Sequence, residues 1–176
     1  MTTHILEPTT GPTECPMEMT VERIRELIPP LVSEILETMF FCEAELEAVT
    51  AAGETSEHSL EFVDDEDPVY RIVIDFQGSP SGRFWLRVTA NAAKSLAADF
   101  LGVDRDDVDE ARSLQTAFEL GNMICGSVVS RVESQAAFAL TAPRLFSVGD
   151  TLPDVRPPYV SFAVSGGKVE VACSLN

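Results

Sequence analysis

The chain has 176 residues, of which 45% are hydrophobic, so its length and composition fit one domain with a buried core. Its formal net charge of −17 repels phosphate backbones and anionic lipid headgroups, so neither a nucleic acid nor a membrane is an expected partner. Four scattered cysteines and two histidines form no Cys-x-x-Cys pair or similar ligand spacing, which argues against a zinc site.

Residues 1–19 are rich in Thr, Pro and Glu and contain no Lys or Arg. A segment of this composition buries too little apolar surface to fold, so we expect a disordered tail followed by a single domain over residues 20–176. The tail lacks the basic flank and the apolar run of a secretory signal, and the chain holds no apolar run long enough to span a membrane. These observations predict a cytoplasmic protein with reduced thiols.

The first helical pattern follows Thr20, a residue type that caps helix N-termini. Apolar residues then recur at helical spacing, but Pro29 and Pro30 interrupt them. A proline inside a helix costs about 3 kcal/mol, whereas a proline at the first helical position is favoured. We therefore expect a short helix ending at about Ile28 and a main helix from Pro30 to about Cys42.

Three strands are predicted next. Residues 58–63 are expected to form a short strand, and residues 68–77 alternate apolar and polar side chains. The Gly- and Pro-containing loop 78–82 reads as a hairpin connection to a third strand over residues 84–89. The acidic run 64–67 lacks the spacing of a calcium loop, so it is interpreted as a solvated turn.

Two helices follow. Residues 91–101 give a short amphipathic helix that Gly102 ends as a C-terminal cap residue. The acidic cluster 104–110 then precedes a long helix that runs to about Glu133. Because acidic side chains in a first turn are favoured by the helix dipole, the cluster needs no metal to explain it.

The C-terminal part is predicted to be mostly strand. Residues 136–141 form one strand, 143–158 a loop, and 159–164 and 169–174 two strands joined by the glycine-rich turn of a hairpin. The strand 159–164 is expected at the sheet edge, where it is free to pair with a second copy. The whole order predicts an α+β fold, with helices packed on a mostly antiparallel β-sheet.

A polar pair stands out on the long helix. Glu119 and Asn122 are three residues apart, so they lie about 60° apart on one face, and Gln115 and Gly126 share their stripe. A mid-helix glycine costs about 1 kcal/mol relative to alanine, so Gly121 and Gly126 indicate that something packs against the backbone here. By the same geometry, the buried stripe is predicted to comprise Leu114, Phe118, Cys125, Val128 and Val132. Glu and Asn are also common on solvated helix faces, so the spacing alone does not favour a functional site.

The run FELGNMICGSVVSRV, followed after a gap by FALTAPRLFSVGD, resembles the CheC/CheX-like phosphatase family. The signature of that family is Glu-x-x-Asn on a long helix and a later Pro, matched here by Glu119, Asn122 and Pro143. The stretch ETMFF, residues 37–41, resembles the end of the family's first helix. The resemblance covers residues 20–176, and the single motif is similar to the CheX type rather than to the CheC type, which has two.

The resemblance implies a phosphatase that acts on the phospho-aspartate of a CheY-like response regulator in two-component or chemotaxis signalling. Asn122 would hold the attacking water and Glu119 would pair with the regulator's active-site lysine, while Gln115, Gly121, Gly126 and Pro143 would support the site or its interface. No cofactor of its own is implied, because Mg²⁺ is expected in the regulator. A homodimer is also implied.

One position departs from the family pattern. The family usually has Ser or Asp four residues before the Glu, and this chain has Gln115. A non-catalytic, dimeric CheX-like module that recognises a response regulator therefore stays open as the alternative. A small-molecule enzyme is less favoured, because the sequence shows no constellation of catalytic residues for one.

Overall fold

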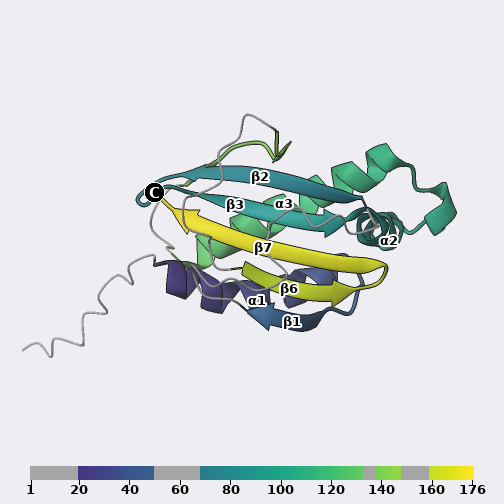
Figure 1. Cartoon of the computed structure of the whole chain (residues 1–176), viewed down its shortest axis with the longest axis horizontal. Coiled ribbons are helices and arrows are strands. Elements are labelled where there is room, and N and C mark those ends of the chain that lie inside the picture. Colours follow the sequence, from purple (N-terminus) through teal and green to yellow (C-terminus); the bar gives the residue numbers. More distant parts are fainter. Residues whose placement is uncertain (1–19, 50–67, 133–137, 148–158) are drawn as a thin grey trace, which may run out of the picture.

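The computed structural model describes residues 20–49, 68–132, 138–147 and 159–176 (Figure 1). The predicted tail 1–19, the predicted strand 58–63 and the acidic run 64–67 lie outside the described residues. The helices are α1 (Val21–Met39), α2 (Ala90–Leu101), the short 3₁₀ helix η1 (Arg105–Asp107) and α3 (Glu110–Val132). The strands are β1 (Glu45–Val49), β2 (Val69–Gln77), β3 (Gly82–Thr89), β4 (Ala139–Leu140), β5 (Arg144–Leu145), β6 (Tyr159–Val164) and β7 (Gly167–Leu175).

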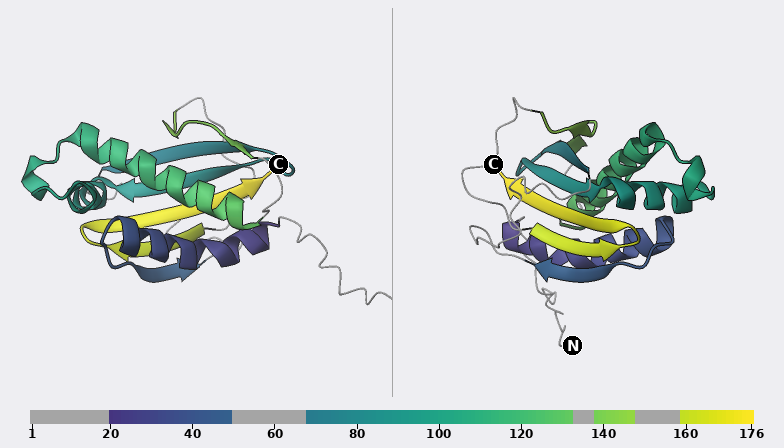
Figure 2. Two further views of the ribbon diagram at one scale, coloured as in Figure 1. Left: turned by 180° about the vertical axis from the view of Figure 1, so that it is seen from behind. Right: turned by 45° about the vertical axis from the view of Figure 1, so that its right-hand side comes forward.

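The described strands form a single sheet in the order β1-β6-β7-β3-β2-β4, and β5 also pairs with β2. Every pairing is antiparallel. The long helices α1 and α3 and the shorter α2 lie together on one face of the sheet (Figure 2). The predicted α+β architecture is confirmed.

The hydrophobic core lies between this sheet face and the helices. Strand side chains alternate between the two faces, and the inward set of β2 and β3 is Ile72, Ile74, Phe76, Phe84, Leu86 and Val88. Strands β6 and β7 add Val160, Phe162, Val169, Val171 and Cys173. Burying this continuous apolar layer fixes which face of each helix points at the sheet.

The prediction for α1 is corrected at its prolines. Thr20 caps the helix as expected, accepting the N–H of Arg23 at 3.2 Å, but the helix continues through Pro29 and Pro30 to Met39. Six of its side chains are buried: Ile24, Ile28, Leu31, Val32, Ile35 and Leu36. Each contributes roughly 1.5–3 kcal/mol, so together they outweigh a cost of about 3 kcal/mol for each of the two interior prolines. Packing on both sides of the prolines therefore holds one helix.

The edges of the sheet also differ from the prediction. Strand β6 is internal, because it pairs with β1 on one side and β7 on the other. Among the described strands, the edge strand is β1, which the sequence did not predict, and at the other side β2 is covered by β4 and β5. Strand β5 falls inside the predicted loop 143–158, so the described residues after α3 contain four strands where three were predicted. The homodimer stays a prediction, but β6 is not free to form it.

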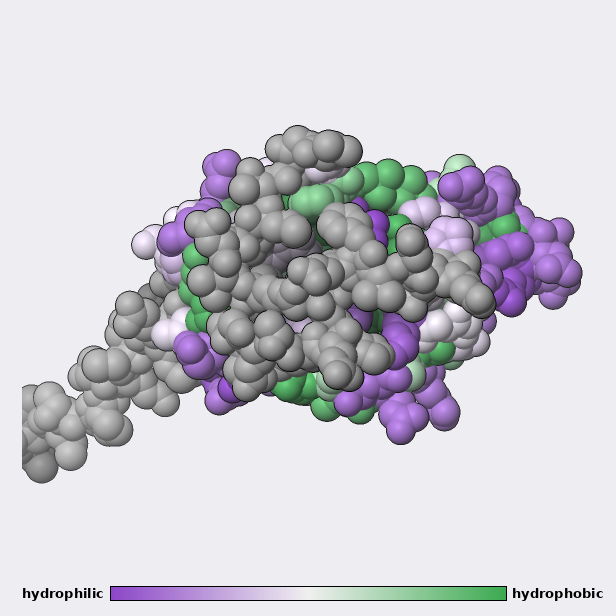
Figure 3. All heavy atoms as spheres, viewed as in Figure 1, coloured by the Kyte–Doolittle hydropathy of each residue, from purple (hydrophilic) through white to green (hydrophobic). Residues whose placement is uncertain are grey.

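The connection between α2 and α3 is built as predicted. Gly102 follows α2 in a left-handed conformation with φ 65°, and Asp109 accepts the backbone N–H of Arg112 through its carboxylate at 2.8 Å. Hydrophilic side chains dominate the surface at this end of the molecule (Figure 3). None of the helices in the described ranges has the length and hydropathy needed to cross a membrane.

The opposite face of the sheet carries a second, smaller cluster, formed by Val73, Trp85, Tyr159 and Ala172. Beside it, Arg87 and Glu170 pair across β3 and β7 at 2.7 Å, with only 15% and 7% of their side chains exposed. Burial lowers the pKa of Arg71, and the charge of Arg87, its cross-strand neighbour, lowers it further. These charges lie on the side of the sheet away from the helices.

Candidate functional site

Helix α3 places the predicted polar pair. Its buried face consists of Ser113, Thr116, Ala117, Leu120, Gly121, Ile124, Cys125, Val128, Val129 and Val132. Leu114 and Phe118, which the sequence assigned to the buried stripe, are only half-buried. The buried face of α3 is therefore rotated relative to the predicted one. The prediction counted only large apolar residues and overlooked the small side chains of Ser113 and Thr116, which are also buried.

The two glycines of the motif have different surroundings. A Cβ on Gly121 would lie 3.0 Å from Ile74 Cδ1 and 3.5 Å from Leu86 Cδ2, so α3 packs with its backbone directly on β2 and β3. A Cβ on Gly126 would meet only Leu140 Cδ1, at 3.8 Å, which is ordinary contact. The expected close packing therefore exists at Gly121 and not at Gly126.

Glu119 and Gln115 are exposed, and Asn122 is half-buried. Among the described residues, none of these three side chains has a hydrogen-bond or ion-pair partner. The stripe predicted from the sequence is thus formed, with Gln115, Glu119, Asn122 and Gly126 following one another along α3. Its carboxylate and amide groups face outward and are available to another molecule.

An open hollow of about 650 Å³ lies beside the first half of this stripe, and we call it the α2–α3 groove. The end of α2 and the residue after its cap supply an apolar wall, and α3 supplies a polar one. Its lining residues are Phe100, Leu101, Val103, Arg112, Gln115, Thr116 and Glu119. The groove brings two of the predicted site residues together with an apolar wall from a different helix.

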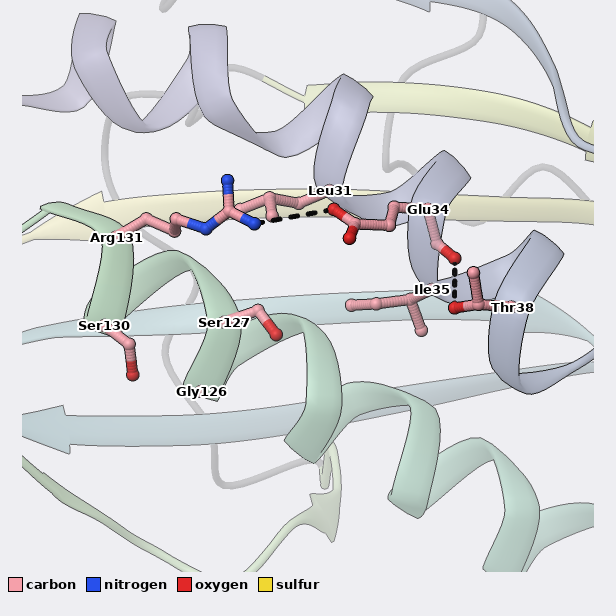
Figure 4. Close-up of a pocket in the computed structure, with 8 residues that line it drawn as sticks. All are labelled: Leu31, Glu34, Ile35, Thr38, Gly126, Ser127, Ser130 and Arg131. Carbon is pink, nitrogen blue, oxygen red and sulfur yellow. Dashed lines mark hydrogen bonds and ion pairs between the residues drawn. The ribbon is translucent and has the colours of Figure 1, made fainter.

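A second hollow, the α1–α3 groove, has a volume of about 390 Å³ and lies between the two long helices (Figure 4). It is lined by Leu31, Glu34, Ile35, Thr38, Gly126, Ser127, Ser130 and Arg131. An ion pair between Arg131 and Glu34, 3.5 Å long, joins the helices at one end (Figure 4). Asn122 lies on the stripe between the residues that line the two grooves.

Pro143 lies between β4 and β5 and is half-buried. This segment is attached to the β2 edge, where the Thr141 N–H donates to the Asp75 carbonyl at 2.9 Å and the Asp75 N–H donates to the Thr141 hydroxyl at 2.9 Å. Its Leu140 reaches towards Gly126. Pro143 itself is not among the residues that line either groove.

The described residues offer this surface few reactive groups. They contain no cluster of three or more His, Cys, Asp or Glu side chains placed to hold a metal ion. Cys125, on the buried face of α3, has its pKa raised to about 12 by burial, so its thiol stays neutral and unreactive at physiological pH. Burial also raises the pKa of Cys173. A carboxylate and an amide remain as the outward-facing groups of the motif.

Sequence reasoning did not assign Arg112, Thr116 or Phe100 to the site. Arg112 and Thr116 lie seven and three residues before Glu119, so helical spacing was a sufficient signal for them. Phe100 comes from α2, and no local pattern connects it to α3. It enters the site only because the two helices pack side by side on the sheet.

The family model of the chemotaxis phosphatase CheX matches residues 70–157, a range that contains α3 and the whole motif. No curated protein sequence matches the chain. Several solved structures of low identity share its fold. A CheX from Vibrio vulnificus is 16% identical and has a TM-score of 0.64, with 90% of this chain and 100% of that chain covered.

A CheX from Desulfovibrio desulfuricans is 18% identical, with a TM-score of 0.61 over 87% of this chain and 99% of that one. A third similar structure, also 18% identical, is a complex of CheX with CheY, BeF₃ and Mg²⁺ from Borrelia burgdorferi. It has a TM-score of 0.60 and covers 86% of this chain and 96% of that chain. With the family model covering half of its length, the chain belongs to the CheX family of chemotaxis phosphatases.

Proposed function

We propose that this protein dephosphorylates the phospho-aspartate of a CheY-like response regulator. Membership of the CheX family supports the reaction, and the complex of a similar CheX with CheY supports the class of partner. The observation that carries the proposal for this chain is the position of Glu119 and Asn122, side by side on the outward stripe of α3 and without partners among the described residues.

Water is the nucleophile in this proposal. An aspartyl phosphate is an acyl phosphate, which is already reactive, so catalysis needs mainly the orientation of water for in-line attack. The oxygen–phosphorus bond to the aspartate breaks, and the products are the free carboxylate and inorganic phosphate. The amide of Asn122 suits this task because it offers both a donor and an acceptor to one water molecule.

Glu119 has the complementary role of docking. In this proposal its exposed carboxylate pairs with the active-site lysine of the regulator, and the interface closes around that pair. The regulator supplies the Mg²⁺ that neutralises the phosphoryl charge, so the phosphatase needs no metal of its own. Gly121 supports the arrangement by letting α3 lie directly on β2 and β3, which fixes the height of the stripe above the sheet.

Gln115 motivates a second candidate function, a module that binds the regulator without hydrolysing its phosphoryl group. Gln115 stands where the family usually has Ser or Asp, and it lines the α2–α3 groove with Glu119. In the phosphatase proposal this position supports the interface and does not touch the water. In the binding proposal, the replacement of the usual Ser or Asp by Gln115 has removed the phosphatase activity.

The two functions are separated by incubating purified phosphorylated receiver domains with Mg²⁺ in the presence and absence of the protein. The phosphatase proposal expects at least one receiver to lose its phosphoryl group faster with catalytic amounts of protein. If stoichiometric protein binds a receiver and leaves the rate of phosphate release unchanged, the binding module is correct. If no receiver is bound or dephosphorylated, both candidates are wrong.

A further inference from the structure

Phe41, directly after α1, is the most exposed large hydrophobic side chain among the described residues, at 76% of its surface. It is also their one non-glycine residue with a positive φ, 50°. The Leu36 carbonyl accepts the N–H groups of both Phe40, at 3.2 Å, and Cys42, at 3.0 Å. The chain therefore makes a tight turn out of the helix, and Phe41 lies in that turn.

The fold gains little from a phenylalanine at this position. A left-handed residue after a helix is usually glycine, because a Cβ is strained there. The flanking residues Phe40 and Cys42 are 0% and 4% exposed, so they anchor the turn while the Phe41 ring points outward. Strain kept without any gain in burial is typical of functional positions.

The end of α1 that leads to Phe41 points towards the Glu119–Asn122 part of α3, because Thr38 near that end lines the α1–α3 groove together with Gly126. Helices α1 and α3 run antiparallel, and the Glu34–Arg131 ion pair links them at one end (Figure 4). Met39, the last residue of α1, is about 7 Å beyond Glu34, and Asn122 is about 13 Å before Arg131, at a helical rise of about 1.5 Å per residue. Phe41, two residues after Met39, therefore lies beyond the end of α1 on the side of Asn122 and not on the side of Arg131.

A ring contact joins the two sides of this surface. Phe40 stacks on Phe100 with 5.1 Å between ring centroids, and Phe100 lines the α2–α3 groove together with Glu119. The ends of α1 and α2 are thus held together, and each ends in exposed apolar side chains. These are Met39 at the end of α1 and Phe41 just after it, and Leu101 at the end of α2 and Val103 just after it.

We propose that Phe41 is an anchor for the receiver domain of the response regulator, inserting its ring into an apolar patch of the receiver while Glu119 and Asn122 meet the phosphorylated centre. The inference rests on the proposed function. A receiver is the fitting occupant because the apolar side chains are continuous with the motif groove. A second copy of this chain seated here would cover Glu119 and Asn122.

The test compares Phe41→Asn with the wild type, because asparagine tolerates the left-handed conformation but removes the ring. The matched control is Leu145→Ala, another exposed apolar side chain, on β5 at the sheet edge. We expect Phe41→Asn to bind a beryllofluoride-activated receiver at least tenfold more weakly. Its melting temperature is expected to equal or exceed that of the wild type, and its dephosphorylation rate at saturation to stay within threefold. Leu145→Ala is expected to leave affinity unchanged.

Three results would overturn the inference. If the wild type dephosphorylates the receiver and Phe41→Asn binds it equally well, the anchor is wrong and the proposed function stands. If the wild type neither binds nor dephosphorylates any receiver, both are wrong. If Phe41→Asn melts at a clearly lower temperature, or turns a dimer into a monomer by light scattering, Phe41 serves the fold or self-association instead.

Discussion

Alanine at each glycine of the motif is expected to change stability in a different direction. A mid-helix Gly→Ala change gains about 1 kcal/mol of helix propensity. At Gly126 the new methyl group meets only Leu140 Cδ1 at 3.8 Å, so the gain is retained. Gly126→Ala should therefore raise the free energy of unfolding by up to about 1 kcal/mol.

At Gly121 the same gain is opposed by overpacking. The new Cβ would lie 3.0 Å from Ile74 Cδ1, and Ile74 is only 1% exposed, so that methyl group has little room to move. Overpacking a core costs about 1–3 kcal/mol. The unfolding free energy of Gly121→Ala should therefore be about 1–3 kcal/mol lower than that of Gly126→Ala. Gly121→Val, which adds two more methyl groups, should be less stable than the wild type by at least about 2 kcal/mol.

Urea denaturation followed by circular dichroism measures the three variants against the wild type under one condition. The wild-type slope with denaturant serves as a control that the variants unfold in the same way. If both alanine variants stabilise the protein equally, α3 does not lie on the sheet at Gly121 as described. The support that Gly121 gives to the site would then be refuted.

Further predictions concern buried, supporting and capping residues. The pKa of Cys125 is about 12 in the folded protein and 9.0 without burial, so its contribution to stability is present below about pH 9 and is lost as the pH rises towards 12. Between pH 9.5 and 11 the unfolding free energy of Cys125→Ala should therefore fall less steeply than that of the wild type, by about 1.4 kcal/mol per pH unit. If urea denaturation at alkaline pH gives the same slope for both proteins, this prediction is wrong. Gln115→Ser should leave regulator dephosphorylation within about tenfold of the wild type, since water positioning falls to Asn122; a much larger gain would favour the binding module. Thr20→Ala should cost about 1 kcal/mol in urea denaturation, because the cap of α1 is lost, and no cost would show that the cap bond to Arg23 does not form in solution.

The sequence predicted the elements whose signals are local and strong. The alternation of residues 68–77 and the glycine-rich turn after β6 defined two hairpins, and β6 has the predicted bounds, Tyr159–Val164. The capping residue Gly102 and the acidic start of α3 were also correct. The spacing of Glu119 and Asn122 placed them on one outward stripe, because helical geometry follows directly from residue number.

The errors arose where distant residues decide the outcome. The continuity of α1 through Pro29 and Pro30 depends on a sheet that later residues build. The internal position of β6 depends on β1, a five-residue strand whose sequence, ELEAV, is acidic and mostly exposed. The turn that exposes Phe41 follows Phe40, whose ring stacks on Phe100 of α2, a contact that no local pattern indicates.

The central claim is that Asn122 acts on water whereas Glu119 acts in docking. The decisive measurement is single-turnover dephosphorylation of a phosphorylated receiver, beside binding of the beryllofluoride-activated receiver, for wild type, Asn122→Ala and Glu119→Ala. We expect Asn122→Ala to lower the maximal rate by about a hundredfold or more with little change in affinity. Glu119→Ala should weaken binding by about 2–5 kcal/mol, the usual cost of removing one partner of a buried ion pair. Neither variant should unfold, because Glu119 is exposed and Asn122 is half-buried. Wild-type hydrolysis by both variants, or unfolding of both, would contradict the assignment of this helix as the phosphatase site.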